Sequence, residues 1–361
     1  MANREESLSA TTPGSDRASP ASPDQSNRLS ADDARRFSLL VEKVRADVRT
    51  VIVGATDTLD LALVALLAGG HMLVEDVPGT GKTTMMKALA VALGCSFNRI
   101  QGTPDLLPTD VSGVSVYNPT NGTFTFRPGP IFGQVVLVDE INRATPRTQA
   151  AFLEAMAEGQ VSADGETRQL PRPFLVLATQ NPIELEGTFP LPEAQLDRFL
   201  IRASMGYPTR DDEVEIVRRF AGDDRSGHRG PTDRSAHMDS GTVLDMQAAT
   251  RLIHVSDAVA MYATDIVRAT RQASGVAFGA SPRATVGLVR AARARALLQG
   301  RSFVLPDDIQ HLATPVLAHR LVLDDESRLR QVPPSTIIQT VIVRIDAPVE
   351  PPATGPSGAN R

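Results

Sequence analysis

Apolar residues in the first half of the chain fall into short continuous runs separated by stretches with helical spacing. The strand-like runs are residues 71–75, 97–100, 135–138 and 175–178, of which 135–138 and 175–178 are apolar at every position. The helix-like stretches are residues 48–68, 82–93 and 145–159. Continuous runs, unlike alternating ones, are typical of strands buried on both faces in a parallel sheet. We therefore expect an α/β domain, a parallel sheet sandwiched by helices, over residues 35–207.

Helical spacing dominates the second half of the chain. The expected helices cover residues 211–220, 246–274, 282–299 and 307–317. Ser281 followed by Pro282 is a helix-start signal, and Gly300 is a helix-stop signal. We expect a small all-helical domain over residues 208–347.

Three segments contain very few large apolar residues. Residues 1–34 and 348–361 are rich in small, polar and charged residues, and residues 222–241 interrupt the helical half. Segments of this composition bury too little surface to offset the entropy lost on folding. We expect disordered terminal tails and a surface insertion.

A glycine-rich loop lies between the first strand-like run and the helix-like stretch 82–93. Its residues are Asp76, Val77, Pro78, Gly79, Thr80, Gly81, Lys82, Thr83 and Thr84. In this context such a loop directs backbone N–H groups and a helix N-terminus toward phosphates. Lys82 would contact the β- and γ-phosphates of ATP, and the Thr83 hydroxyl would bind Mg²⁺. The motif has glycine where this chain has Asp76, so we expect a strained, left-handed backbone there.

The alternative interpretation of this loop is a plain glycine turn with Lys82 on the surface. The chain has 37 basic residues, but only Lys43, Lys82 and Lys87 are lysines. A chain that nearly always uses arginine places a lysine where a compact ammonium group is needed. This bias favours the phosphate-binding interpretation.

Two apolar runs end in side chains suited to hydrolysis. The run 135–138 is followed by Asp139 and Glu140, and a later run leads to Gln180 and Asn181. Asp139 is suited to hold Mg²⁺ through its water, and Glu140 to take a proton from the attacking water. Asn181, ahead of Gln180, is the candidate to orient that water or touch the γ-phosphate. Taken singly, these features are also an acidic turn and an Asn-Pro turn.

Two arginines are candidates for stabilising the transition state. Arg198 lies in the expected short helix 193–199, and Arg283 follows the helix-start signal at Ser281. Each is either a solvated charge or a cation that reaches a γ-phosphate, and Arg198 is suited to do so in a neighbouring subunit.

Composition narrows the function classes. The net charge is −5, which argues against a strongly basic nucleic-acid binder. Cys95 is the only cysteine, so the sequence predicts a reducing, cytoplasmic compartment. No apolar run is long enough for a membrane span. Arg290, Arg293 and Arg295 share one expected helix, and we interpret them as a solvated face.

Together these motifs resemble the MoxR family of AAA+ ATPases, which are P-loop NTPases with a helical lid domain. The resemblance rests on residues 75–83, 102–110, 139–144, 178–184, 192–199 and 281–284. It implies that Asn181 is the first sensor, Arg198 a trans-acting arginine finger and Arg283 the second sensor. One departure is Gly102, where the family commonly has an aromatic residue.

The resemblance also implies assembly and partners. It implies a hexameric ring with ATP at subunit interfaces, a von Willebrand factor A domain partner, and chaperone-like maturation of clients, including metal or cofactor insertion. Two hairpin insertions of the family fit residues 110–126 and 160–170, which would face the pore or a client. The alternative for both is simple decoration of the sheet.

Three other functions stay open at this stage. A ring ATPase of this kind is also a candidate nucleic-acid translocase, a metal-chelatase subunit or a slowly hydrolysing scaffold. The acidic balance argues against the first, and Glu140 argues against the last. The six histidines show no short spacing typical of metal ligands.

Overall fold

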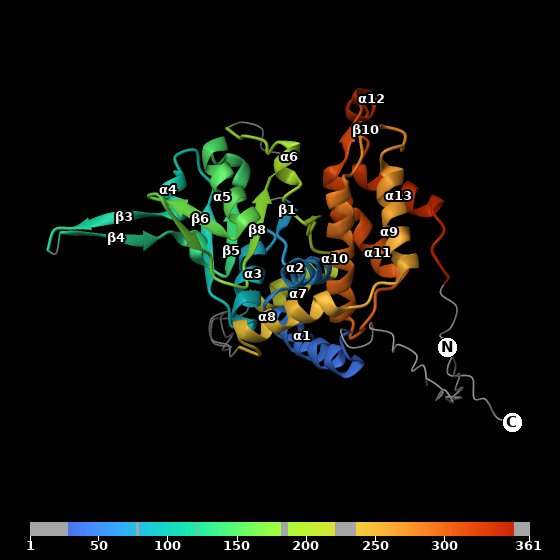
Figure 1. The fold of residues 1–361 in the computed structure, drawn as a ribbon, viewed down its shortest axis with the longest axis horizontal. Coiled ribbons are helices and arrows are strands. Elements are labelled where there is room, and N and C mark those ends of the chain that lie inside the picture. Colours follow the sequence, from blue (N-terminus) through green and yellow to red (C-terminus); the bar gives the residue numbers. More distant parts are fainter. Residues whose placement is uncertain (1–27, 77–78, 121, 182–186, 221–235, 350–361) are drawn as a thin grey trace, which may run out of the picture.

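A five-stranded parallel sheet forms the centre of the molecule, with a group of helices beside it (Figure 1). The computed structural model describes residues 28–76, 79–120, 122–181, 187–220 and 236–349. The strands, in spatial order, are β2 (Phe97–Gln101), β5 (Val135–Asp139), β8 (Leu175–Gln180), β1 (Met72–Glu75) and β9 (Ile201–Ala203). Neighbouring strands pair in parallel throughout, as the continuous apolar runs predict.

The sheet separates two apolar cores. Because successive side chains of a strand point to opposite faces, Leu137 belongs to one core and its neighbour Val136 to the other. The helices of the first core are α1 (Ala31–Val51), α2 (Thr56–Leu67) and α3 (Lys82–Ala92), and α5 (Pro146–Glu158) covers the opposite face. This arrangement explains why β5 and β8 each begin with four consecutive apolar residues, and it confirms the expected fold class.

Local signals define the ends of α5 as predicted. The Thr145 hydroxyl accepts a hydrogen bond from the Thr148 N–H group, and Pro146 occupies the first helical position. Gly159 ends the helix with a left-handed φ of 64°, a conformation that glycine adopts without steric cost. The helix at residues 145–159 is therefore fixed by its own sequence.

The helical region packs around α10, whose small alanines allow close contact with several helices. Its helices are α7 (Arg210–Phe220), α8 (Ser240–Leu252), α9 (Asp257–Thr270), α10 (Pro282–Leu298), α11 (Pro306–Leu317), η3 (Ala318–Arg320), α12 (Asp325–Leu329) and α13 (Pro334–Arg344). One antiparallel pair, β10 (Val276–Phe278) with β11 (Val322–Leu323), is an addition to the all-helical expectation. Within the described ranges, the helices all fall short of the length and apolarity that crossing a membrane requires.

Two predicted helices are each divided in two. The stretch 48–68 breaks because Gly54 and Ala55 have left-handed φ values of 72° and 54°, so α1 ends at Val51 and α2 starts anew. The stretch 246–274 breaks at His254. There the backbone bonds with Ser302 and Val304, and the Ser256 hydroxyl caps the next helix.

The expected polar segments are partly ordered. Helix α1 begins at Ala31 and buries Ala34, with Ser30 as its cap, so the expectation of disorder is wrong for residues 31–34. At the end of the segment 222–241, Met238 is buried and His237 bonds to Asp47 at 2.7 Å, so those residues are not a surface insertion. Residues 1–27, 222–235 and 350–361 lie outside the described residues.

Both predicted hairpins are present. The first pairs β3 (Gly113–Asn118) with β4 (Thr123–Pro128), although its turn residue Asn121 lies outside the described residues. The second pairs β6 (Gln160–Ala163) with β7 (Glu166–Gln169). The first hairpin extends far from the sheet (Figure 1).

Candidate nucleotide-binding and hydrolysis site

A cavity of about 320 Å³ lies at the carboxyl ends of β1, β5 and β8. In open parallel sheets, ligands bind at this edge. The cavity is lined by Asp76, Gly79, Thr80, Gly81, Lys82, Thr83, Thr84, Arg99, Gln101, Asp139, Glu140, Thr179, Gln180 and Asn181. The fold therefore brings together the glycine-rich loop and both polar strand ends. Val77 and Pro78 lie outside the described residues.

The loop presents one lysine to the cavity. Gly79 and Gly81 have φ values of +86° and +87°, which lets the chain turn directly into the start of α3. The Lys82 ammonium donates to the Thr80 hydroxyl at 3.0 Å and lies 4.0 Å from the Asp76 carboxylate. Burial lowers the pKa of Lys82, and the charges of Asp76 and Asp139 oppose that shift. A buried ammonium beside backbone N–H groups is suited to bind phosphate.

Asp76 does not have the left-handed backbone expected for it. Its N–H group donates to the Gln180 carbonyl at 3.2 Å, so Asp76 continues the pairing of β1 with β8. Among the described residues, the non-glycine positions with positive φ are Ala55, Glu140, Asp164 and Gln331. The prediction of strain at Asp76 is therefore wrong.

The strain instead occurs at Glu140, with φ 54° and ψ 51°. A backbone of this kind costs about 1–3 kcal/mol and persists where the surroundings fix it. Gly102 is part of those surroundings, because its N–H group donates to the Asp139 carbonyl at 2.7 Å. A Cβ atom on Gly102 would lie only 2.2 Å from the Glu140 carbonyl oxygen. This close approach explains why an aromatic residue at 102 does not suit this chain.

Neighbouring strands hold the two carboxylates. The Glu140 carboxylate accepts a hydrogen bond from the Gln101 amide at 3.0 Å, and the Glu140 N–H group donates to the Thr179 hydroxyl at 2.9 Å. Asp139 pairs with the Arg99 guanidinium at 2.6 Å. Both carboxylates thus have defined positions at the cavity wall.

Three of these partners are absent from our sequence-based list of site residues: Arg99, Gln101 and Thr179. The pairing of Gln101 with Asp139 and of Arg99 with Leu137 places β2 side chains beside the acidic pair. Only the register between strands about 40 positions apart in the sequence reveals that Arg99 and Gln101 lie beside Asp139 and Glu140. Thr179 directly precedes Gln180, so its position at a strand end was the available signal.

The amides that end β8 differ in their surroundings. The Gln180 side chain donates to the Glu75 carboxylate, which also pairs with Arg202. Asn181 lines the cavity beside Glu140. Both amides line the cavity, and the choice of Asn181 as the sensor residue stays a prediction.

The two arginine candidates are not among the residues that line the cavity of their own chain. The Arg198 guanidinium donates to the Leu153 carbonyl of α5 at 2.6 Å. Arg283 lies at the start of α10, where its guanidinium is 3.9 Å from the Asp197 carboxylate and two-thirds exposed. Arg283 therefore lies close to Asp197, the residue that directly precedes Arg198 in the chain.

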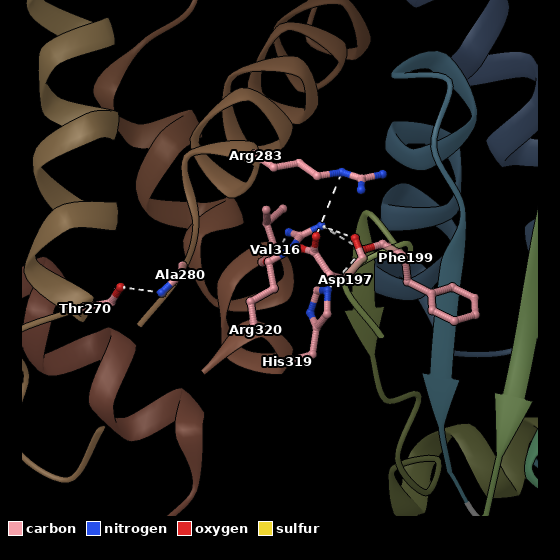
Figure 2. Close-up of polar contacts among 8 residues, drawn as sticks. All are labelled: Asp197, Phe199, Thr270, Ala280, Arg283, Val316, His319 and Arg320. Atoms are coloured by element: carbon pink, nitrogen blue, oxygen red, sulfur yellow. Dashed lines mark hydrogen bonds and ion pairs between the residues drawn. The ribbon is translucent and has the colours of Figure 1, made fainter. Parts of the chain in front are cut away.

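Figure 2 shows how the helical region holds the segment that carries Arg198. The buried Arg320 guanidinium pairs with the Asp197 carboxylate at 2.7 Å and donates to the Phe199 carbonyl at 2.8 Å. It also donates to the Val316 carbonyl. The His319 ring donates to the same Phe199 carbonyl at 3.0 Å, and burial lowers the pKa of His319 to about 3. These contacts fasten η3 to the residues that follow α6 (Glu193–Leu196).

Replacing Arg320 by Met is expected to lower the free energy of unfolding by about 3 kcal/mol. The change leaves three carbonyl groups and a carboxylate without their buried cation. Chemical denaturation measures the loss. Arg283→Met is the matched control, because that exposed arginine at 3.9 Å should contribute less than about 1 kcal/mol. Equal losses in the two variants would contradict the structural role of Arg320.

Sequence comparisons identify the family of this chain. Residues 71–201 match the ATPase family associated with various cellular activities, and residues 268–341 match the AAA lid domain. Chaperone MoxR1 of Mycobacterium tuberculosis is 40% identical, over 93% of this chain and 89% of that protein. Protein MoxR of Paracoccus denitrificans is 36% identical, over 77% and 87%. The chain belongs to the MoxR family of AAA+ ATPases.

A solved structure agrees with this assignment to the MoxR family. The crystal structure of a protein from Cytophaga hutchinsonii, which was assigned as an ATPase, superposes on this chain with a TM-score of 0.82. The two sequences are 35% identical, and the match covers 88% of this chain and 98% of that one. In this MoxR-family protein, the sheet with its cavity therefore corresponds to the AAA core, and α10–α13 fall mostly within the match to the AAA lid.

Proposed function

We propose that this protein hydrolyses ATP with Mg²⁺ and uses the energy for chaperone-like remodelling or maturation of protein clients, including metal or cofactor insertion. The observation that carries the proposal is the convergence of Lys82, Asp139 and Glu140 on one cavity. The proposal assigns the phosphates to Lys82 and the loop N–H groups, the attacking water's proton to the Glu140 carboxylate, and the orientation of that water to Asn181.

The cavity offers oxygen donors that fit Mg²⁺. The Thr83 hydroxyl and the Asp139 carboxylate, both in its lining, are the residues that would hold the ion. Bound Mg²⁺ neutralises charge on the β- and γ-phosphates. Arg99, which pairs with Asp139, has a half-exposed side chain and therefore has room to move away.

We propose a hexameric ring in the cytoplasm, with a von Willebrand factor A domain protein as partner. In this ring Arg198 acts on the ATP of the neighbouring subunit, and Arg283 acts as the second sensor. The position of both arginines outside the lining of their own cavity supports an active site that is shared between subunits. The domain boundaries at residues 208 and 348 remain part of the proposal.

The projecting hairpin supports contact with a protein client. Val114, Val116, Tyr117 and Phe124 are all exposed, and the Phe124 ring is 71% exposed. The two aromatic rings lie 5.3 Å apart on paired strands. Apolar side chains gathered on a projecting element are typical of interaction sites.

Capture of clients by an ATP-trapped variant tests the proposed function. Glu140→Gln should retain a specific set of proteins with ATP and release it with ADP. The matched control adds Tyr117→Ser and Phe124→Ser to the same variant, which should lose capture while still binding ATP. Capture that is independent of nucleotide, or unchanged by the two hairpin substitutions, would contradict the proposal.

Neither duplex nor single-stranded DNA is expected to stimulate the ATPase at physiological salt. Binding to a phosphate backbone requires a continuous basic surface, and the net charge here is −5. Turnover measured with and without DNA over a salt series checks this. Saturable stimulation that weakens as salt rises would favour the translocase alternative.

A further inference from the structure

A second cavity, of about 600 Å³, lies at the opposite edge of the sheet from the candidate ATP site. His71 and Phe174, which directly precede β1 and β8, form part of its wall. The ends of α2 and α5, residues 172–173 before β8, and the helices α8 and α10 supply the rest. A volume of this size is typical of sites for small organic molecules.

The lining of this cavity is strongly basic. It contains Arg172, Arg251, Arg290 and Arg293, and it contains no Asp or Glu. None of the four forms an ion pair with a carboxylate of the described residues. The interpretation of the α10 arginines as a solvated face is therefore wrong for Arg290 and Arg293, which line a cavity.

The hydrogen-bonding capacity of these arginines is largely unused. The Arg290 guanidinium donates to the Ala68 and Gly69 carbonyls. The Arg293 Nε atom is buried and has no hydrogen-bond partner among the described residues. Buried polar groups nearly always have partners, so an unpaired guanidinium nitrogen in a cavity indicates a missing anion.

The surrounding charges also lack compensation. Burial lowers the pKa of Arg290, and the positive charges of Arg251 and Arg283 lower it further. His71 offers these arginines no free hydrogen-bond acceptor, because its two ring nitrogens already bond to the Met156 carbonyl and the Val176 N–H group. By contrast, Arg295 on the same helix pairs with the buried Asp308 at 3.0 Å. The chain thus pairs a structural arginine but leaves the cavity arginines unpaired.

We propose that this cavity binds a small phosphate-bearing organic anion with at least two negative charges, at a site separate from the ATP site. The planar guanidinium fork matches phosphate oxygens in a bidentate manner. Four such groups suit phosphate, which carries up to two charges on one group, better than a single carboxylate. Leu67, Met156 and Phe174 provide apolar contacts for the organic part of the ligand.

Thermal unfolding of the full chain with pyrophosphate as the probe tests this site. Saturating ADP occupies the ATP site, and NaCl at equal ionic strength provides the salt control. Pyrophosphate should raise Tm in proportion to the logarithm of its concentration, by about 5 °C near a hundred times the dissociation constant. The same titration with citrate in place of pyrophosphate shows whether the site prefers carboxylates or phosphates.

The double variant Arg251→Gln with Arg293→Gln removes two cations whose side chains make no hydrogen bond in the described residues. It should weaken the pyrophosphate response at least about tenfold. Without anion it should unfold at a temperature no lower than wild type, because like-charge repulsion is reduced. The matched control is Arg268→Gln with Arg344→Gln, two exposed arginines of the helical region, which should respond like wild type.

Three results would overturn the proposed anion site, and a fourth would overturn its phosphate class. The first is a wild-type response no larger than that to NaCl, and the second is an undiminished response in the double variant. The third is loss of oligomers in sedimentation of the double variant without any anion response, which would assign the cavity to contact between copies of the chain. An equal or stronger response to citrate would overturn the phosphate class.

Discussion

Replacing Glu140 by Gln should lower the ATPase turnover at least about a hundredfold while ATP binding persists. The amide cannot accept the proton of the attacking water, and a general base contributes about 10²–10⁴ in rate. Binding should survive because the proposed phosphate contacts are made by Lys82 and the loop rather than by Glu140. Steady-state phosphate release and equilibrium nucleotide binding measure the two properties.

The position of Glu140 makes this test specific. Its carboxylate is fixed by Gln101 at 3.0 Å and its backbone by Thr179, so the isosteric amide should occupy the same place. Glu154→Gln, the same chemical change at an exposed position of α5, is the control and should retain full turnover. Turnover of Glu140→Gln within tenfold of wild type would refute its role as the base.

Replacing Arg198 by Ala is expected to reduce turnover by about 10³–10⁵, the contribution of an arginine finger in other NTPases. The reason is that Arg198 contacts α5 through Leu153 and is not among the residues that line its own ATP cavity. Its cation is therefore available to a neighbouring subunit. Activity should depend on assembly, because each site is complete only with two subunits.

Mixing inactive variants tests the trans arrangement directly. Arg198→Ala and Lys82→Ala subunits together create some interfaces with both an intact loop and an intact arginine, so partial activity should return. Lys82→Ala mixed with Thr83→Ala is the matched control, and no activity should return because both lesions lie in the same loop. Mixed rings that stay inactive at all ratios would leave Arg198 a structural or cis residue. Arg143, which lies 3.4 Å from the Glu140 carboxylate, or Arg283 would then become the better finger candidate.

The helical region contacts the segment that carries Arg198 through Arg320. Arg198 lies between Asp197 and Phe199, and Arg320 contacts both of these neighbours. A shift of η3 is therefore transmitted to the backbone on both sides of Arg198. Arg320→Met should lower turnover as well as stability if Arg198 needs this support.

The sequence by itself determined the features that depend on neighbouring residues. The apolar runs specified the buried strands, and Thr145 with Gly159 specified the ends of α5, because caps and glycine turns are made within a few residues. The glycine-rich loop predicted a phosphate site for the same reason. The acidic pair at residues 139–140 lines the same cavity as this loop, because parallel strands present their carboxyl ends at one edge.

Only the tertiary structure decided the features that join distant parts of the chain. His254 interrupts a helical pattern because its backbone pairs with residues near Phe303, about 50 positions away. The contacts of Gln101 with Glu140 and of Arg320 with Asp197 depend on strand register and helix packing, which local propensity does not encode. The basic cavity has the same origin, because it unites arginines from α8, α10 and the loop before β8, and its charge becomes visible only once they share one enclosed volume.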